Sequence, residues 1–277
     1  MLESLASQSG VDWSGVEVLI VDNNSTDDTA NVVSAAATRL PVRRVVEQVQ
    51  GLANARNRAL AVARGEWIIF TDDDVLLEPD WLLSYAEAFD TFPEAGFAGG
   101  RIVPLWKNGP PGWFKGERLD LMNGVLVWYD LGTDVRIATS ADPEPFGASF
   151  ALRRALVDRI GVFHPGLGMH GTRLGRGEET EFFLRAVAAG AKGIYVGRAL
   201  CRHPVQLDRL TLAALYRYGV ASGRAHRAIR NPRETGSRVK GVAFLARGML
   251  QLLKGRGDRF RQCVINAGIQ AGLASHK

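Results

Sequence analysis

Three consecutive carboxylates, Asp72, Asp73 and Asp74, follow directly on the apolar run 67–70. Such a run, bounded by polar residues, is typical of a buried strand, and open α/β sheets bind their ligands where such strands end. Three like charges this close repel one another, and a shared divalent cation reduces that repulsion. The triplet therefore predicts a metal and phosphate site, although a solvated turn that caps the next segment explains the same residues.

Other charged residues could contribute to the same site. Asp22 ends a second apolar run, where a carboxylate can accept hydrogen bonds from a base or a ribose, and Arg56 has the planar donor fork that suits phosphate. The acidic run 178–181 could supply a carboxylate that takes a proton from an attacking hydroxyl, or it could only favour a helix dipole. His203 offers an imidazole, a common ligand for Mn²⁺-type sites, although a lone histidine is more often structural.

Alternating strands and helices must position these residues. The order predicts an α/β fold with a mixed, mostly parallel sheet flanked by helices. We expect the breaker-rich stretch 104–145 to be irregular and to form a substrate-side wall. Strands are predicted at 16–21, 42–49, 67–70, 93–100 and 194–196, and helices at 2–8, 29–40, 52–63, 81–89, 154–160, 178–189 and from 210 onward.

Composition excludes several classes of protein. The apolar fraction of 46% is ordinary for a packed globular chain, so disorder is not expected. Cys201 and Cys263 are too few and too far apart for a disulfide framework or a thiolate metal cluster, which favours a reducing, cytosolic compartment. No segment approaches the roughly 18 uninterrupted apolar residues of a membrane span, and the N-terminus has no secretory signal pattern.

Charge is distributed unevenly along the chain. From residue 216 onward 13 basic residues face two acidic ones, a charge of +11, which leaves −6 for residues 1–215 out of the total of +5. Apolar residues between Arg238 and Lys254 fall largely on one helical face with basic residues at its margins. This stripe either rests on an anionic membrane surface or packs on the catalytic domain. Nucleic acid is not an expected partner, because few aromatic residues are interleaved with the basic ones.

Five motifs in order over residues 1–205 resemble family 2 inverting glycosyltransferases of the GT-A fold. The resemblance implies a GT-A-like catalytic domain over 1–205, with a basic helical extension over 206–277. Members of this family normally begin with an additional strand, so we expect a shortened chain with unpaired edges on two neighbouring strands. The motifs are Val-Leu-Ile-Val-Asp-Asn-Asn-Ser-Thr-Asp at 18–27, Leu-Ala-Asn-Ala-Arg-Asn at 52–57, Phe-Thr-Asp-Asp-Asp-Val at 70–75, Phe-Gly-Ala-Ser-Phe-Ala-Leu-Arg-Arg at 146–154 and Gly-Glu-Glu-Thr-Glu at 177–181.

The resemblance also implies a role for each candidate residue. Glu179 takes the position of the catalytic base, with Glu178 and Glu181 as alternatives. Asp74 is the expected direct metal ligand, and Asp72 and His203 complete the metal site. The residues expected to contact the nucleotide are Asp22, Asn24, Arg56, Asp72 and Asp73, and those on the acceptor side are Gly147, Ala148 and Ser149.

These roles imply transfer of a sugar from a nucleotide-diphosphate sugar to a hydroxyl of a saccharide or lipid-linked acceptor, in polysaccharide or glycolipid synthesis. The expected cofactor is Mn²⁺ or Mg²⁺, and the expected location is the cytoplasm, with peripheral attachment to the cytoplasmic face of a membrane. Two alternatives remain at this stage. One is a nucleotidyltransferase that makes the sugar nucleotide, and the other is a noncatalytic protein that binds a metal ion and an anion.

Overall fold

The computed structural model describes residues 1–116, 120–169, 175–229 and 235–275, and its chain divides into two compact units. The first unit comprises Met1–Val103, Tyr129–Gly171 and Glu178–His203. The second comprises Pro104–Trp128, Thr172–Gly177 and Pro204–Lys277. The second unit thus joins the C-terminal part of the chain to Pro104–Trp128, a segment that the sequence analysis assigns to the catalytic domain.

The N-terminal part of the first unit contains a β-α-β arrangement. Strands β1 (Val18–Asp22) and β2 (Val42–Val46) are parallel, with Val18 opposite Val42, and α2 (Thr29–Ala36) connects them. Parallel neighbours need such a crossover, so the predicted β-α-β order is confirmed here. The helix ends four residues before its predicted end at Leu40, and the chain turns before Pro41, as expected from the restricted backbone of a residue that precedes proline. The 3-10 helix η1 (Trp13–Gly15) precedes β1, and α3 (Leu52–Val62) follows β2.

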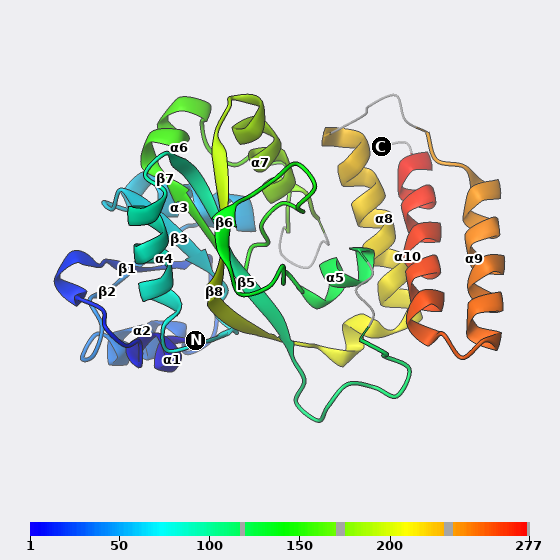
Figure 1. The fold of residues 1–277 in the computed structure, drawn as a ribbon, viewed down its shortest axis with the longest axis horizontal. Helices are drawn as coiled ribbons and strands as arrows, with labels where there is room; N and C mark the ends of the chain where they lie inside the picture. The colour runs from blue at the N-terminus through cyan, green and yellow to red at the C-terminus, as the bar shows by residue number, and fades with distance from the viewer. Residues whose placement is uncertain (117–119, 170–174, 230–234, 276–277) are drawn as a thin grey trace. The chain divides into compact units, whose positions relative to one another are not determined.

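A six-stranded sheet forms the centre of the first unit (Figure 1). Its order is β3-β7-β5-β8-β4, with β6 paired to β8. The pairs β3–β7, β5–β7, β4–β8 and β6–β8 are antiparallel, so parallel pairs do not dominate as the sequence predicts. The paired strands are far apart in the sequence, so the local alternation of strands and helices does not predict which strands pair or in which direction. The strands are β3 (Trp67–Thr71), β4 (Leu76–Leu77), β5 (Ala95–Leu105), β6 (Val135–Ile137), β7 (Ser149–Arg153) and β8 (Lys192–Pro204).

Helices cover both faces of this sheet because successive side chains of a strand point to opposite faces. Trp67 of β3 stacks on Phe89 of α4 (Trp81–Thr91), with ring centroids 3.9 Å apart. On the other face, Phe150 of β7 lies 5.7 Å from Phe183 of α7 (Glu178–Ala188). The short helices α1 (Leu2–Ala6) and α6 (Arg154–Ile160) complete the unit. Its main core is aromatic and apolar and includes Ala53, Leu60, Phe97, Phe150, Leu152, Phe163, Phe182 and Phe183.

The second unit is helical (Figure 1). Its elements are α5 (Asp120–Leu126), η2 (Leu207–Leu210), α8 (Leu212–Ile229), α9 (Arg238–Leu253) and α10 (Gly257–Ala274). Helices α8 and α10 approach closely because Gly219 and Gly268 face each other, and a Cβ on either would meet backbone of the other helix. No helix among the described residues is long and apolar enough to cross a membrane.

The stretch 104–145 is more ordered than its breakers predict. It contains α5 and β6, and its aromatic residues join a core in the second unit. Met122 and Leu126 of α5 pack with Leu215 of α8 and Ile265 of α10. Burial of apolar side chains therefore orders a segment that local propensity marks as a loop.

Candidate active site

The acidic triplet lies at the carboxyl end of β3, as predicted. Thr71, the last residue of the strand, donates a hydrogen bond from its hydroxyl to the carbonyl of Ala148 (3.0 Å), which fixes the strand end against the start of β7. The chain then turns through the triplet into β4. Because β4 pairs with β8 so that Leu76 lies opposite Arg202, the next residue of β8, His203, lies beside the triplet.

Asp72, Asp74 and His203 form a candidate metal site. The His203 Nε2 atom lies 3.9 Å from Asp72 Oδ2 and 3.8 Å from Asp74 Oδ1, and the three potential ligand atoms lie within 4.8 Å of one another. His203 is buried, whereas Asp74 is exposed, so the cluster has a rigid side and an open side. Two carboxylates and one imidazole suit a divalent cation of the Mn²⁺ type. Asp73 is exposed and lies outside this cluster.

The surroundings of Asp72 favour its protonated form. Burial, opposed by the positive charge of Arg56 and reinforced by the negative charges of Glu179, Asp74 and Asp73, raises the pKa of Asp72 from 3.8 to about 6. Burial is the largest cause of this shift, and the charge of Arg56 offsets it only in part. Because the charges of Arg56 and Glu179 both act on Asp72, these two side chains lie within electrostatic reach of the triplet.

Arg56 connects the two glutamates at the start of α7. Its Nη2 donates to Glu179 Oε1 (2.6 Å) and its Nη1 to Glu178 Oε1 (3.2 Å), and its guanidinium lies 5.4 Å from the ring centroid of Phe150. Burial lowers the pKa of Arg56, but Glu179, Glu178 and Asp72 raise it more, so the net shift is upward. The side chain is buried and its fork is occupied by glutamates. Both arms of the guanidinium thus bind glutamates in this structure, and the nucleotide contact of Arg56 stays a prediction.

The glutamates at the start of α7 have different surroundings. The Glu179 side chain is 27% exposed, whereas that of Glu178 is 6% exposed. Glu181 pairs with Arg185 one turn along the helix, at 2.6 Å. Glu179 and Glu181 are thus both held by an arginine and partly exposed, but Glu179 is the one that pairs with Arg56 and acts on Asp72.

Gly147 leaves room for the ion pair at this site. A Cβ at this position would meet both the Glu179 carboxylate and the Arg56 guanidinium at distances that real Cβ atoms do not show. Glycine thus lets the chain before β7 approach the ion pair. Its neighbours Ala148 and Ser149 are fully buried, and the Ser149 hydroxyl accepts a hydrogen bond from Trp81 Nε1 (3.0 Å). Both side chains are covered by protein in this structure, and their predicted place on the acceptor side stays a prediction.

Asp22, at the end of β1, is buried and held by polar partners. It accepts hydrogen bonds from the backbone N–H of Ser25 (2.8 Å) and from Arg44 Nε (2.9 Å). The Ser25 backbone and the Arg44 side chain together lower the pKa of Asp22 from 3.8 to about 2. Asn24, two residues on, has a left-handed backbone with φ of 64° and donates from its side chain to the carbonyl of Gln48. Both residues therefore hold the turn that follows β1.

Residues 1–161 match the family model described as glycosyl transferase family 2. The chain belongs to this family. The match includes Asp22, Arg56 and the acidic triplet, and it ends before Glu179 and His203. The protein is thus a glycosyltransferase, and membership sets aside the two alternatives named above, a nucleotidyltransferase and a noncatalytic binding protein.

Similar proteins agree with the family 2 assignment. The chain is 25% identical to the succinoglycan biosynthesis protein ExoM of Rhizobium meliloti, over 100% of this chain and 88% of the relative. It is 23% identical to a glucosyl-dolichyl phosphate glucuronosyltransferase of Haloferax volcanii, over 57% of this chain and 49% of the relative.

Solved structures show that the glycosyltransferase has the GT-A fold. The mannosyltransferase PcManGT of Pyrobaculum calidifontis, solved with GDP-Man and Mn²⁺, aligns with a TM-score of 0.62 at 21% identity, over 98% of this chain and 81% of that one. TarS of S. aureus, in complex with UDP-GlcNAc, aligns with a TM-score of 0.54 at 16% identity, over 95% and 85% of the two chains.

Arg44 and Asn23 contribute to the site region, although neither was given a role from the sequence. Arg44 lies in β2 and is identified only by its contact with Asp22, because parallel pairing brings the two strands together. Asn23 binds the carbonyls of Glu47 (2.8 Å) and Val49 (2.9 Å), and its side-chain oxygen accepts from the backbone N–H of Gly51 (2.7 Å). An asparagine in a turn after a strand is common, so only the structure shows that it connects the end of β2 to the start of α3.

Proposed function

We propose that this glycosyltransferase transfers a sugar from a nucleotide-diphosphate sugar to an acceptor hydroxyl, with inversion at the anomeric carbon and with a divalent cation. The observation that carries the proposal is geometric: Asp72, Asp74 and His203 bring their potential ligand atoms within 4.8 Å of one another, and Arg56, whose charge acts on Asp72, donates to Glu179 at 2.6 Å. It joins a candidate metal site and a candidate base in one unit of the protein. A transferase of this kind needs both, one for the leaving diphosphate and one for the attacking hydroxyl.

In this proposal Asp72, Asp74 and His203 hold the cation. A bound Mn²⁺ or Mg²⁺ would offset the negative charge that develops on the leaving diphosphate. Asp72 must lose its proton before it can bind a cation, and its pKa of about 6 allows this at neutral pH. Asp73 is exposed beside these ligands and is proposed to contact the donor substrate.

Glu179 is the proposed catalytic base, which accepts the proton of the acceptor hydroxyl. Its hydrogen bond to Arg56 fixes the carboxylate, and its partial exposure leaves it accessible to a substrate. Glu178, which is buried against the other arm of the same guanidinium, positions Arg56. We retain Gly147 on the acceptor side, since it lies against the Glu179 carboxylate.

Asp22 and Asn24 are proposed to form the nucleoside side of the site. Asp22 keeps its negative charge over the whole physiological range because its pKa is about 2. Its Oδ1 bonds to Ser25 and its Oδ2 to Arg44, so it shapes the turn that would receive the base or ribose. The names of the similar proteins support a sugar nucleotide as donor, since two of them were solved with GDP-Man or UDP-GlcNAc.

The acceptor is proposed to be a saccharide or a lipid-linked saccharide in the synthesis of a polysaccharide or glycolipid. Similarity to a succinoglycan biosynthesis protein and to a transferase named for a dolichyl phosphate acceptor supports this class. Such acceptors are found at membranes. We therefore propose that the protein works in the cytoplasm, at the cytoplasmic face of a membrane.

A donor screen tests this function. The protein is incubated with a panel of UDP-, GDP- and dTDP-sugars and with Mn²⁺, Mg²⁺ or a chelator, and release of the nucleoside diphosphate is measured. The active pair is then used to compare Asp74→Ala and Glu179→Gln with Glu181→Gln, a carboxylate on the same helix that pairs with Arg185. We expect the first two variants to lose transfer and the third to keep it. Near-normal transfer by Glu179→Gln would remove the base from that position, and product with retained anomeric configuration would exclude inversion.

A further inference from the structure

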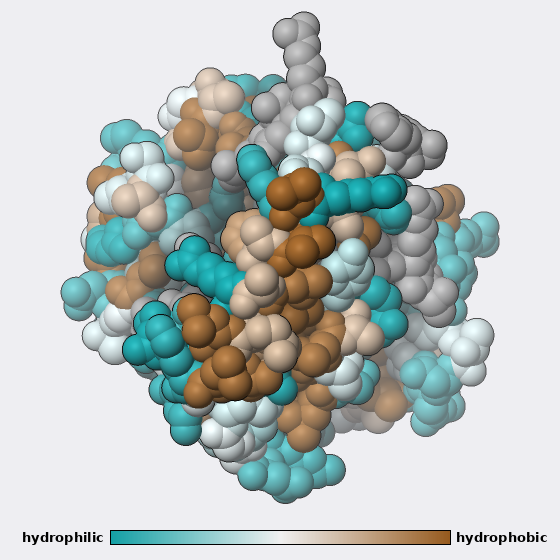
Figure 2. Space-filling view, turned by 90° about the vertical axis from the view of Figure 1, so that its right-hand side faces the viewer, coloured by the Kyte–Doolittle hydropathy of each residue, from teal (hydrophilic) through white to brown (hydrophobic). Residues whose placement is uncertain are grey.

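Helix α9 presents an apolar stripe to the outside. Val239 is 80% exposed, Val242 67% and Leu253 82%, and Met249 and Leu250 are each at least half exposed. At 3.6 residues per turn these five residues fall within about 100° of one another, so they lie on one side of the helix. Figure 2 shows apolar side chains gathered on the face of the molecule where α9 lies in Figure 1. Exposed apolar patches of this kind mark interaction sites.

The stripe is not the side of α9 that packs within the second unit. The opposite side of the helix contacts α10. Gly248 is buried there, and a Cβ on it would lie 3.0 Å from Cys263 Cβ and 3.0 Å from Phe260 Cδ2. Phe244, four residues earlier, is partly buried on the same side. One apolar side of α9 therefore packs against α10, and a second apolar side is exposed and can bind a partner.

Basic residues border the stripe. Lys240, Arg247 and Lys254 recur every seven residues, so they form a row along one margin, and Arg238 lies at the other margin. Residues 235–257 contain five basic residues and no acidic one. A partner surface must therefore be negatively charged as well as apolar.

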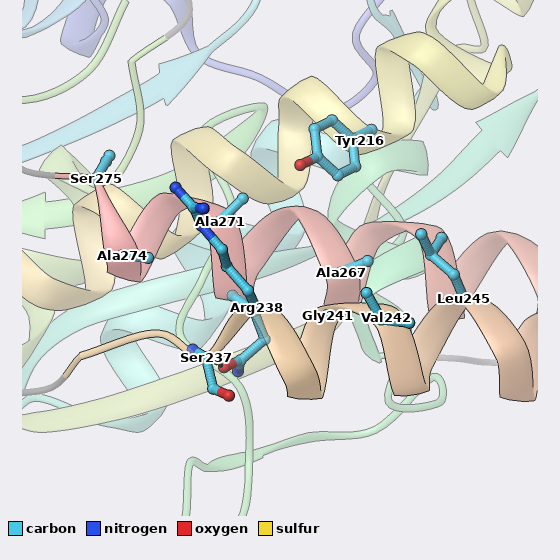
Figure 3. Close-up of a pocket in the computed structure, with 11 residues that line it drawn as sticks. Tyr216, Ser237, Arg238, Gly241, Val242, Leu245, Ala267, Ala271, Ala274 and Ser275 are labelled. Carbon is cyan, nitrogen blue, oxygen red and sulfur yellow. Dashed lines mark hydrogen bonds between the residues drawn. The ribbon is translucent and has the colours of Figure 1, made fainter.

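A groove extends the apolar surface at the Arg238 margin. It has a volume of about 530 Å³ and lies in the second unit, where Val242 and Leu245 of α9 face Ala267 and Ala271 of α10 (Figure 3). Arg238 reaches across it. Apolar walls with a guanidinium at the edge suit an amphiphile with an anionic head.

We propose that α9 lies flat in the headgroup region of a membrane that contains anionic lipids, with the stripe inserted and its basic margins among the phosphates. Amphipathic helices with cationic margins bind such surfaces by both apolar burial and charge. A second copy of this chain would fit the stripe poorly. It would place its own five basic residues of 235–257 opposite the same five, with no acidic residue in either segment to pair with them. This inference rests on the proposed function, because membrane binding would place the site near a lipid-linked acceptor.

Vesicle flotation tests the proposal. The full chain is mixed with vesicles of phosphatidylcholine alone or with about one-third phosphatidylglycerol, without any sugar nucleotide. We expect strong preference for the anionic vesicles, weakened by salt. Lys240→Gln, Arg247→Gln and Lys254→Gln combined should lower anionic binding by roughly fivefold per residue, on the order of 100-fold in total. The control replaces three exposed basic residues of the first unit, Arg64, Arg159 and Lys192, by Gln.

A second set of variants tests the apolar stripe. Val239→Ser, Leu250→Ser and Leu253→Ser combined should lower binding at least tenfold, because these side chains would no longer favour insertion. The same change at Val32, Val187 and Leu207, which are also exposed, should have little effect. Circular dichroism of each variant verifies that the helices are retained.

Three outcomes would overturn the proposal: equal binding to neutral and anionic vesicles, no loss in the α9 variants relative to their controls, or dimerisation of the free protein that the stripe variants abolish. Asp74→Ala separates this inference from the proposed function. We expect that variant to bind vesicles as the wild type does while it loses transfer. Membrane binding without transferase activity in the wild type would contradict the proposed function alone, and transfer without membrane binding would contradict this inference alone.

Discussion

Replacement of Gly147 by alanine adds one methyl group where the chain approaches the ion pair between Arg56 and Glu179. The new Cβ would lie 2.5 Å from Arg56 Nη2, whereas real Cβ atoms essentially never come within 3.0 Å of a heavy atom. The guanidinium must therefore move from 2.5 to at least 3.0 Å, that is by 0.5 Å or more, and the Glu179 carboxylate must move as well. The backbone at Gly147 is not left-handed, so the effect is steric rather than conformational.

The displacement predicts a loss of rate larger than the loss of stability. A misplacement of about 1 Å in a catalytic group can cost roughly 100-fold in rate, so we expect a 10- to 100-fold lower kcat. Overpacking by one methyl group typically costs about 1–3 kcal/mol in the free energy of unfolding. The protein should therefore remain folded while it loses most of its activity.

Initial rates of nucleoside diphosphate release, measured with the active donor and cation, give the kcat of Gly147→Ala, and thermal unfolding gives its stability. Gly15→Ala is the matched control, because a Cβ there meets no heavy atom within 4 Å. A kcat within threefold of the wild type in a folded Gly147→Ala protein would refute the reasoning, since the pair could then shift without consequence for the reaction.

Three further predictions concern the carboxylates. Asp74→Asn and His203→Ala should each weaken Mn²⁺ binding in calorimetry by more than about 10-fold, whereas Asp73→Asn should change it little. Mn²⁺ affinity of the wild type should fall as the pH drops below about 6, because Asp72 then holds a proton that the cation must displace. Asp22→Asn should lower the free energy of unfolding by about 1–2 kcal/mol at pH 7, and since the folded-state pKa is the lower one, denaturation curves should converge with the wild type as the pH falls from about 4 to 2.

Local patterns in the sequence locate most elements of the first unit. The α6 helix agrees with its prediction at both ends, and α3 and α7 each agree to within one residue. Apolar runs and breakers determine these elements, so the position of the triplet after β3 could be predicted. Strand β8 extends over Lys192–Pro204, although only 194–196 were predicted, because its residues pair with several other strands that are distant in the sequence.

The contacts of the candidate site could not be predicted in the same way. Arg56 and Glu179 lie 123 residues apart, and nothing local to either shows that they pair. The phosphate preference of arginine suggested a nucleotide contact, and only the structure shows that Arg56 is buried beside an aromatic ring and paired with two glutamates. From the sequence, Ser149 is a polar residue within a motif. Only the structure shows that it is buried and accepts a hydrogen bond from Trp81.

The charge balance of the site explains why a cation fits it. One buried guanidinium, that of Arg56, faces Glu178 and Glu179 directly and also acts on Asp72. A single positive charge cannot balance three carboxylates, and the negative charges of Glu179, Asp74 and Asp73 add to burial, the largest cause, in raising the pKa of Asp72. A proton on Asp72 relieves the deficit by one charge, whereas a divalent cation bound between Asp72, Asp74 and His203 would relieve it by two. Donor diphosphate, which is itself anionic, would meet a repulsive site without that cation, so metal and donor are expected to bind together rather than independently.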